Sequence, residues 1–71
     1  MTDQKFLAKL GSRIKQLRKE KEMTQNELAI ACDFEKASMS RIESGKTNVS
    51  ILTLIKIAKA LKVKPFDLFI E

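Results

Sequence analysis

The sequence lacks most of the residue types on which small enzymes, metal sites and disulfide-linked scaffolds depend. Its 71 residues include no histidine, tyrosine or tryptophan, and Cys32 is the only cysteine. One cysteine excludes an internal disulfide framework. No metal-ligand spacing and no glycine-rich phosphate loop occurs. We therefore expect a protein that is not an enzyme and that binds no metal, cofactor or small molecule.

Long apolar runs are missing as well. No stretch is long enough to cross a bilayer, and the first residues lack the apolar centre of a signal peptide. A cytoplasmic protein without a membrane role is expected. The formal net charge of +5 and the pI near 9.6 favour a polyanionic partner. Charge alone does not separate nucleic acid from an anionic membrane surface.

What the sequence does contain is helical patterning. Apolar residues at positions 7, 10, 14 and 17 form one stripe with helical spacing. Thr24 and Glu27 match a capping box, and Ser50 suits a helix N-cap. Gly45 suits a helix end, and Pro65 suits a first helical position. The sequence predicts a single all-α domain over residues 1–71, with helices at about 3–21, 25–32, 35–44, 51–61 and 65–69.

Residues 25–44 have the layout of a helix-turn-helix. Two short helices are joined by about three residues, and apolar side chains occupy the positions where the helices cross. Ala29 is small enough to let the second helix approach closely. Any helical hairpin shows such a pattern, so periodicity alone favours DNA recognition and a purely structural hairpin about equally. The apolar set is Leu28, Ala29, Cys32, Phe34, Met39 and Ile42.

Three segments carry a more specific pattern, namely MTQNELA from Met23, SMSRIESGK from Ser38 and SILTLIKIAKAL from Ser50. In order and spacing they resemble the Cro/phage-repressor, or XRE, helix-turn-helix family over about residues 14–69. The resemblance implies a compact five-helix repressor-like domain that binds double-stranded DNA at a palindromic operator as a homodimer. A chain this short is similar to stand-alone Cro-like repressors and to controller proteins of restriction–modification systems. With no room for an effector domain, regulation is expected through concentration, dimerisation and operator occupancy.

The resemblance places the outward face of the second motif helix in the major groove. Arg41 can bind guanine O6 and N7 with two hydrogen bonds, and Lys36 can do the same or bind a phosphate. The Ala37 methyl can pack against a thymine methyl. Ser38 and Ser40 can bond to a base edge or to a phosphate. The alternative for each residue is a solvated helix surface.

Further roles follow from position in the family. Gln25 resembles a residue that contacts a DNA phosphate at the start of the first motif helix. Arg18 and Glu43 match a structural ion pair that ties the first helix of the domain to the second motif helix. The loop after that helix lies along the DNA backbone in this family, which implies phosphate contacts, although an ordinary polar turn is the alternative. The loop residues are Lys46, Thr47 and Asn48.

Two positions depart from the family pattern. Asp33 stands where a turn glycine is usual, and we expect it to adopt the left-handed conformation at some cost in strain. Glu35 replaces the usual Ser or Thr cap and places negative charge near DNA. Its carboxylate can accept a hydrogen bond from cytosine N4 or can repel phosphates, so its role stays open.

Apolar side chains near the C-terminus are expected at the surface and predict a two-fold dimer interface. Some of them can instead fold back onto the core. A rival function uses the same face: a protein-interaction module such as an antitoxin or anti-repressor. The predicted interface residues are Leu52, Phe66, Phe69 and Ile70, with Ile55 as a possible contributor.

Overall fold

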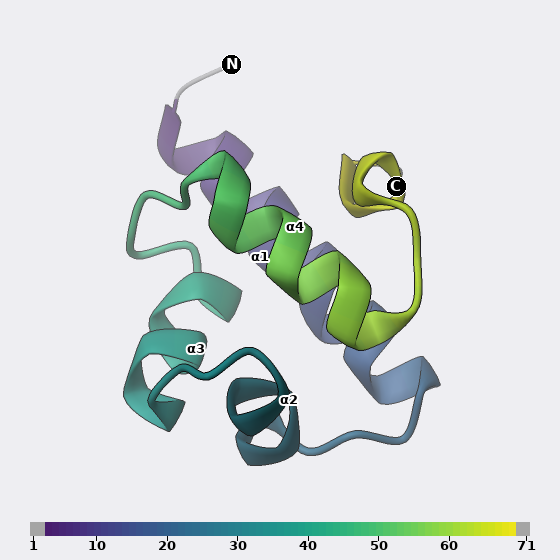
Figure 1. The fold of residues 1–71 in the computed structure, drawn as a ribbon. Coiled ribbons are helices and arrows are strands. Elements are labelled where there is room, and N and C mark those ends of the chain that lie inside the picture. The colour runs from purple at the N-terminus through teal and green to yellow at the C-terminus, as the bar shows by residue number, and fades with distance from the viewer. Residues whose placement is uncertain (1–2, 70–71) are drawn as a thin grey trace.

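The computed structural model describes residues 3–69 (Figure 1). These residues form four α-helices and a short 3-10 helix, and they contain no strand. The all-helical architecture expected from the sequence is therefore confirmed. The elements are α1 (Asp3–Glu20), α2 (Gln25–Ala31), α3 (Lys36–Glu43), α4 (Ile51–Leu61) and the 3-10 helix η1 (Pro65–Phe69).

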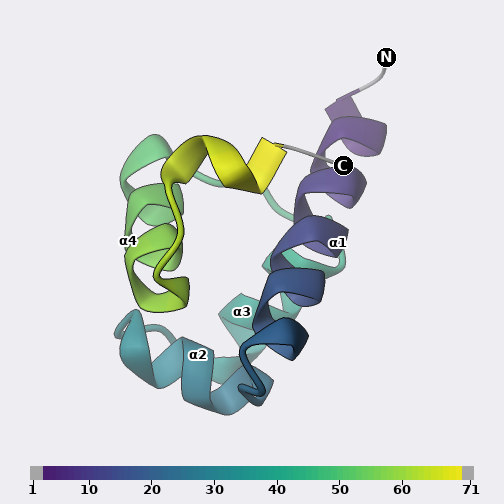
Figure 2. The ribbon, with the colours of Figure 1, turned by 90° about the vertical axis from the view of Figure 1, so that its right-hand side faces the viewer.

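The hydrophobic core lies between α1 and α4 and is closed by α2 and α3 at one end and by η1 at the other (Figure 2). Six members are fully inaccessible to solvent, and the four largest of them come from four different helices: Ile14, Leu28, Met39 and Ile57. Burial of each such side chain contributes about 1.5–3 kcal/mol. Leu10, Ile14 and Leu17 of the predicted α1 stripe are buried, whereas Leu7 is only half-buried.

Local hydrogen bonds determine where α2 and α4 begin. The Thr24 hydroxyl accepts from the Glu27 amide at 3.0 Å, and the Glu27 carboxylate accepts from the Thr24 amide at 2.8 Å. These bonds hold the pKa of Glu27 below its usual value. The Ser50 hydroxyl accepts from the Thr53 amide at the start of α4. Glu35 caps α3 without any side-chain hydrogen bond.

Each of the four α-helices ends in a Schellman motif, in which two amides just beyond the helix return to carbonyls of its last turn. At the end of α3 the Lys46 amide donates to the Arg41 carbonyl at 2.9 Å, and Gly45 has the required positive φ of 73°. The other three motifs place non-glycine residues in the left-handed region: Glu22, Asp33 and Lys62. The left-handed conformation expected of Asp33 is thus present, at φ 60°.

The first helix runs unusually close to the C-terminal end of α3. Gly11 is buried, and a Cβ atom at this position would collide with the carbonyl oxygens of Ile42 and Glu43. Gly45 faces α1 in the same way, because a Cβ there would lie 2.7 Å from the Ala8 Cα. Two glycines therefore allow α1 to rest directly on the backbone at the end of α3.

The last segment differs from the expected fifth α-helix, because Pro65–Phe69 forms a 3-10 helix. Five residues are too few to build an α-helical ladder, and short helical segments of this length often take the tighter 3-10 form. The Asp67 carboxylate instead accepts from the Lys64 amide at 3.0 Å. Buried Leu68 attaches this segment to the core. Within residues 3–69, no helix combines the length and the hydropathy needed to span a membrane.

Candidate nucleic-acid interface

Where helices α2 and α3 cross, α2 carries a small residue. Ala29 is fully buried there, and the Phe34 amide donates to its carbonyl at 2.8 Å. The turn between the helices is thereby tied to α2. Met39 and Ile42 of α3 point into the core, so the opposite side of α3 is left on the molecular surface.

That outward side carries the residues expected to read DNA. Lys36, Ala37, Ser40 and Arg41 are exposed, and Ser38 is half-buried. Within residues 3–69, no hydrogen bond or ion pair engages the Arg41 guanidinium. All five of its N–H donors therefore remain available to a ligand. Glu35, just before the helix, is exposed as well.

A buried ion pair fixes the angle of α3 against α1. Arg18 Nε donates to Glu43 Oε2 at 2.7 Å, and its Nη2 donates to Glu43 Oε1 at 3.1 Å. The Arg18 and Glu43 side chains are only 10% and 3% exposed. Arg18 Nη1 also donates to the Met23 carbonyl at 2.8 Å, at the entry to α2. One guanidinium thus connects three helices.

Gln25 belongs to the same network, which the sequence did not indicate. Its side-chain amide donates to Glu43 Oε1 at 3.1 Å and is half-buried. One of its two N–H donors is therefore directed into the protein. A phosphate contact by Gln25, as expected from its position, has to use the remaining side-chain donor or the backbone.

The loop after α3 lies beside the start of α1. Lys46 and Asn48 are exposed, Thr47 is half-buried, and the Thr47 hydroxyl donates to the Asn48 carbonyl at 3.4 Å. A shallow depression of about 330 Å³ separates this loop from Gln4 and Leu7. Gln4, which the sequence analysis did not single out, thus shares a surface with the predicted phosphate-binding loop.

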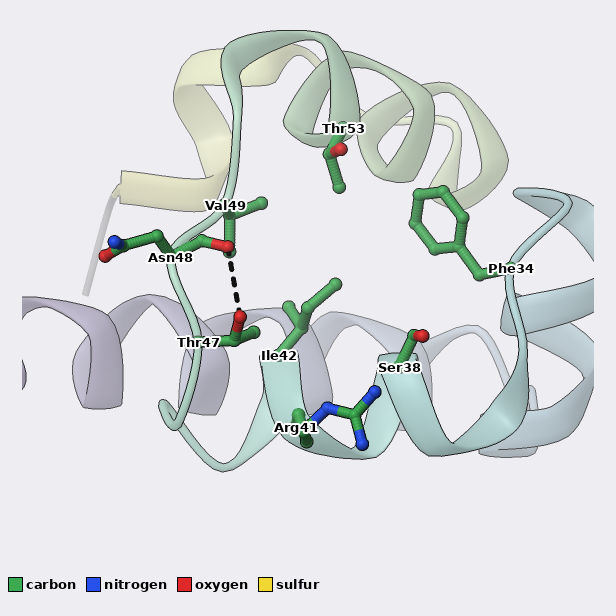
Figure 3. Close-up of a pocket in the computed structure, with 8 residues that line it drawn as sticks. All are labelled: Phe34, Ser38, Arg41, Ile42, Thr47, Asn48, Val49 and Thr53. Atoms are coloured by element: carbon green, nitrogen blue, oxygen red, sulfur yellow. Dashed lines mark hydrogen bonds between the residues drawn. The ribbon is translucent and has the colours of Figure 1, made fainter.

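A second depression separates the other side of the loop from α3 (Figure 3). Its volume is about 250 Å³. Ile42, Val49 and Phe34 direct apolar side chains toward its centre, and Thr53 points into it from α4. Polar groups of Ser38, Arg41 and Thr47 lie around these walls, whereas the side-chain amide of Asn48 points away from the depression. We call this depression the α3–loop groove.

Positive charge is not concentrated on the motif itself. Residues 23–50 carry three basic and four acidic side chains, while residues 1–22 carry seven basic and three acidic ones. The excess of positive charge therefore comes from residues 1–22, which include α1, and from the chain beyond residue 50. The local net charge of the motif therefore does not favour DNA. Attraction to DNA at this face depends instead on the positions of three basic residues, Lys36 and Arg41 on α3 and Lys46 in the loop after it.

The predicted dimer residues have different environments. Leu52 and Phe66 are 73% and 58% exposed, and Ile55 is half-buried. The ring of Phe69 stacks on Phe6 of α1 at 6.0 Å between centroids, so it is partly used within the chain. Ile70 lies outside the described residues. Among residues 3–69, three further large apolar side chains are exposed and were not predicted: Phe6, Ile30 and Ile51.

Chemistry-bearing groups are few in this part of the molecule. Burial raises the pKa of the Cys32 thiol, although Lys56 acts in the opposite direction. The thiol is therefore protonated at neutral pH and a poor nucleophile. No cluster of three His, Cys, Asp or Glu side chains suitable for a metal ion occurs among residues 3–69.

Comparison with known proteins gives a consistent result. Residues 14–68 match the family model described as Helix-turn-helix. The chain is 44% identical over 59 residues to Control protein C.BamHI of Bacillus amyloliquefaciens, covering 82% of this chain and 73% of the relative. It is 39% identical over 62 residues to Control protein C.MunI of Mycoplasma sp, covering 86% and 84%.

The chain is also similar to the solved structure of a controller protein. The restriction-modification controller protein C.AhdI from Aeromonas hydrophila superposes with a TM-score of 0.87 at 35% sequence identity. The match covers 89% of this chain and 96% of that protein. The resemblance noted in the sequence is therefore confirmed by an independent fold comparison.

Proposed function

The chain belongs to the helix-turn-helix family of transcriptional regulators, and on that premise we propose that it binds one double-stranded DNA sequence, a palindromic operator, as a homodimer. The observation that carries the proposal is the exposed polar face of α3. A short helix packed on the core through Met39 and Ile42 keeps Lys36 and Arg41 exposed, and no other residue of the described range 3–69 engages their side-chain donors. In a helix-turn-helix this face enters the major groove.

Each side chain has a distinct role in this proposal. Arg41 and Lys36 read bases, because guanidinium and ammonium donors match the acceptors of guanine in the major groove. Ala37, Ser38 and Ser40 contact base edges beside them. Contacts to the phosphate backbone set the register and come from the loop and from the start of α2. The proposed phosphate contacts are Gln25, Lys46, Thr47 and Asn48.

The proposed dimer uses the exposed apolar surface beyond residue 50. Leu52 and Phe66 form its centre, and Phe69 and Ile55 are further members. Ile70, which lies outside the described residues, stays a predicted contact. Phe6 extends it, because the stacked Phe6 ring lies on the same surface as Phe69. A two-fold axis through this surface is expected to present two α3 helices about 34 Å apart, one turn of DNA, to a palindromic site.

Two substitutions separate base reading from phosphate binding. Arg41→Ala is expected to cost about 1–3 kcal/mol on the preferred site and to relax specificity at one base pair. Lys46→Ala is expected to weaken preferred and unrelated duplexes alike and to reduce the salt slope by about one phosphate. Titrations of both variants at several salt concentrations, on a duplex selected from a random pool, give these values.

The rival function predicts a different result. A protein-interaction module that uses the apolar surface beyond residue 50 does not depend on Arg41 or Lys46, so neither substitution changes its binding. If neither variant differs from the parent protein on any duplex, α3 does not read DNA.

The dimer has its own test. Leu52→Glu places charge on an exposed position, so the fold is expected to stay intact while the two-fold contact is lost. Sedimentation should show a dimer for the parent chain and a monomer for the variant. Lys59→Glu, which changes another exposed residue of the same helix, is the control and should leave the dimer intact. A parent chain that is monomeric both with and without DNA contradicts the proposed assembly.

A further inference from the structure

The α3–loop groove combines polar residues at its edge with an apolar inner wall, and a surface whose only task is to hold phosphate does not need such a wall. Its inner wall is apolar and is formed by Ile42, Val49 and Phe34. Both Val49 and Phe34 are half-buried and pack against the core, so the wall is held in place from behind. Phosphate oxygens gain nothing from such a wall, whereas an apolar group does.

Only one base offers an apolar group in the major groove. Guanine, adenine and cytosine present hydrogen-bond donors and acceptors there, and thymine alone adds a methyl group at C5. A concave apolar wall beside a DNA-reading helix therefore selects the 5-methyl edge of a pyrimidine. The volume of about 250 Å³ exceeds what one methyl group needs, so the edge of the base that carries the methyl also fits.

Arg41 borders the same groove. Its guanidinium extends along α3 toward Ser38 and stays outside the apolar wall (Figure 3). A base bound by Arg41 is therefore next to a base whose edge enters the groove. Guanine is the best partner for a two-donor contact from arginine. The groove and the guanidinium together thus fit two neighbouring bases rather than one.

We propose that the α3–loop groove binds the 5-methyl edge of a thymine that neighbours the guanine read by Arg41, and that Val49 is the main specificity-determining residue for this thymine. The proposal rests on the DNA-reading role of α3, and it assigns to Val49 a thymine contact for which the outward face of α3 otherwise offers only the Ala37 methyl. Each half of the operator should therefore contain a thymine adjacent to the guanine that Arg41 binds.

Replacement of thymine by deoxyuridine tests the methyl contact, because it removes that group and leaves base pairing unchanged. The probe is the duplex selected from a random pool by the full chain, remade with deoxyuridine at one thymine at a time. At the thymine beside the Arg41 guanine we expect binding to weaken about fourfold, the ratio that corresponds to burial of one methyl-sized group. 5-Methylcytosine, paired with guanine at the same position, should bind more tightly than cytosine.

The groove itself is tested by the ratio of thymine to deoxyuridine affinity within each variant, which does not depend on how stable the variant is. Val49→Ala and Val49→Thr should both bring the ratio close to one. Ala37→Gly is the matched control, because Ala37 is the other candidate for a thymine methyl, and it should leave this ratio near four.

Four outcomes overturn the inference without affecting the proposed function. The selected site can lack any thymine whose methyl matters, the ratio can survive both Val49 variants, or it can disappear only in Ala37→Gly. If Val49→Ala weakens all duplexes equally, the groove holds the sugar of the backbone and the inference is wrong. Failure of the proposed function is a separate result, because the random pool then yields no preferred site at all.

Discussion

Replacing Glu43 by alanine is expected to cost about 3–5 kcal/mol of folding free energy, because the change leaves the buried Arg18 guanidinium without its counter-charge. The Glu43 carboxylate accepts from Arg18 and from the Gln25 amide, so three helices lose their shared contact. A domain of 71 residues has in total roughly 4–11 kcal/mol of stability. The variant is therefore expected to be partly or largely unfolded at room temperature.

Urea and thermal denaturation followed by far-UV circular dichroism measure this loss. Glu20→Ala is the matched control, since Glu20 is exposed near the end of α1, and its cost should stay within about 0.5 kcal/mol. Arg18→Ala combined with Glu43→Ala should cost less than the two single changes added together. A loss below about 1 kcal/mol for Glu43→Ala would mean that the pair does not hold α3 in place.

Replacing Gly11 by alanine is expected to destabilise the protein, against the usual effect of this change in a helix. On an exposed helix surface, alanine is about 1 kcal/mol more stable than glycine. At Gly11 the new Cβ atom would lie 2.5 Å from the Ile42 carbonyl oxygen and would also collide with that of Glu43. The neighbouring atoms belong to the backbone and cannot rotate away. We expect a loss of about 1–3 kcal/mol from overpacking.

Gly11→Ala should also weaken sequence-specific DNA binding. The collision pushes α1 away from the end of α3, so the angle of the reading helix changes and sequence-specific binding falls even in the folded fraction. Ser12→Ala, one residue further along α1 and exposed, is the control and should alter neither property. A gain in stability for Gly11→Ala is the outcome that rules out close contact between these helices.

The helix starts could be predicted because their causes are local. Thr24 and Glu27 are three residues apart, and the hydrogen bonds that link them are formed within one helical turn. The same is true of Ser50 and Thr53. Asp33 was expected in the left-handed region because the turn between α2 and α3 needs one such residue, and its φ of 60° agrees.

Contacts between distant parts of the chain were harder to predict. Gly11 shows no helix-breaking or turn pattern, and its importance depends on backbone atoms more than thirty positions away. The side chain of Gln25 was expected to face outward, but Glu43 draws its amide inward across eighteen positions. No periodicity within a single helix contains this information.

The environments of the exposed apolar side chains were also hard to predict from the sequence. Phe69 was expected to serve a partner subunit, yet its ring already stacks on Phe6 near the other end of the chain. Ile30 is 69% exposed on α2, outside the surface assigned to dimer formation, and has no assigned role. Helical spacing predicted the exposure of Leu52 and Phe66 but not that of Ile30, and it contains no information on the neighbours that a side chain finds in a distant segment.

Competition between two duplexes of equal length tests most directly whether α3 distinguishes base pairs. One duplex carries the site selected from a random pool, and the other carries the same bases in scrambled order. At physiological salt the full chain is expected to bind the selected duplex at least about 10³ times more tightly. Equal affinity for both duplexes, falling together as salt is raised, would contradict the account, because the outward face of α3 would then recognise only the charge of DNA.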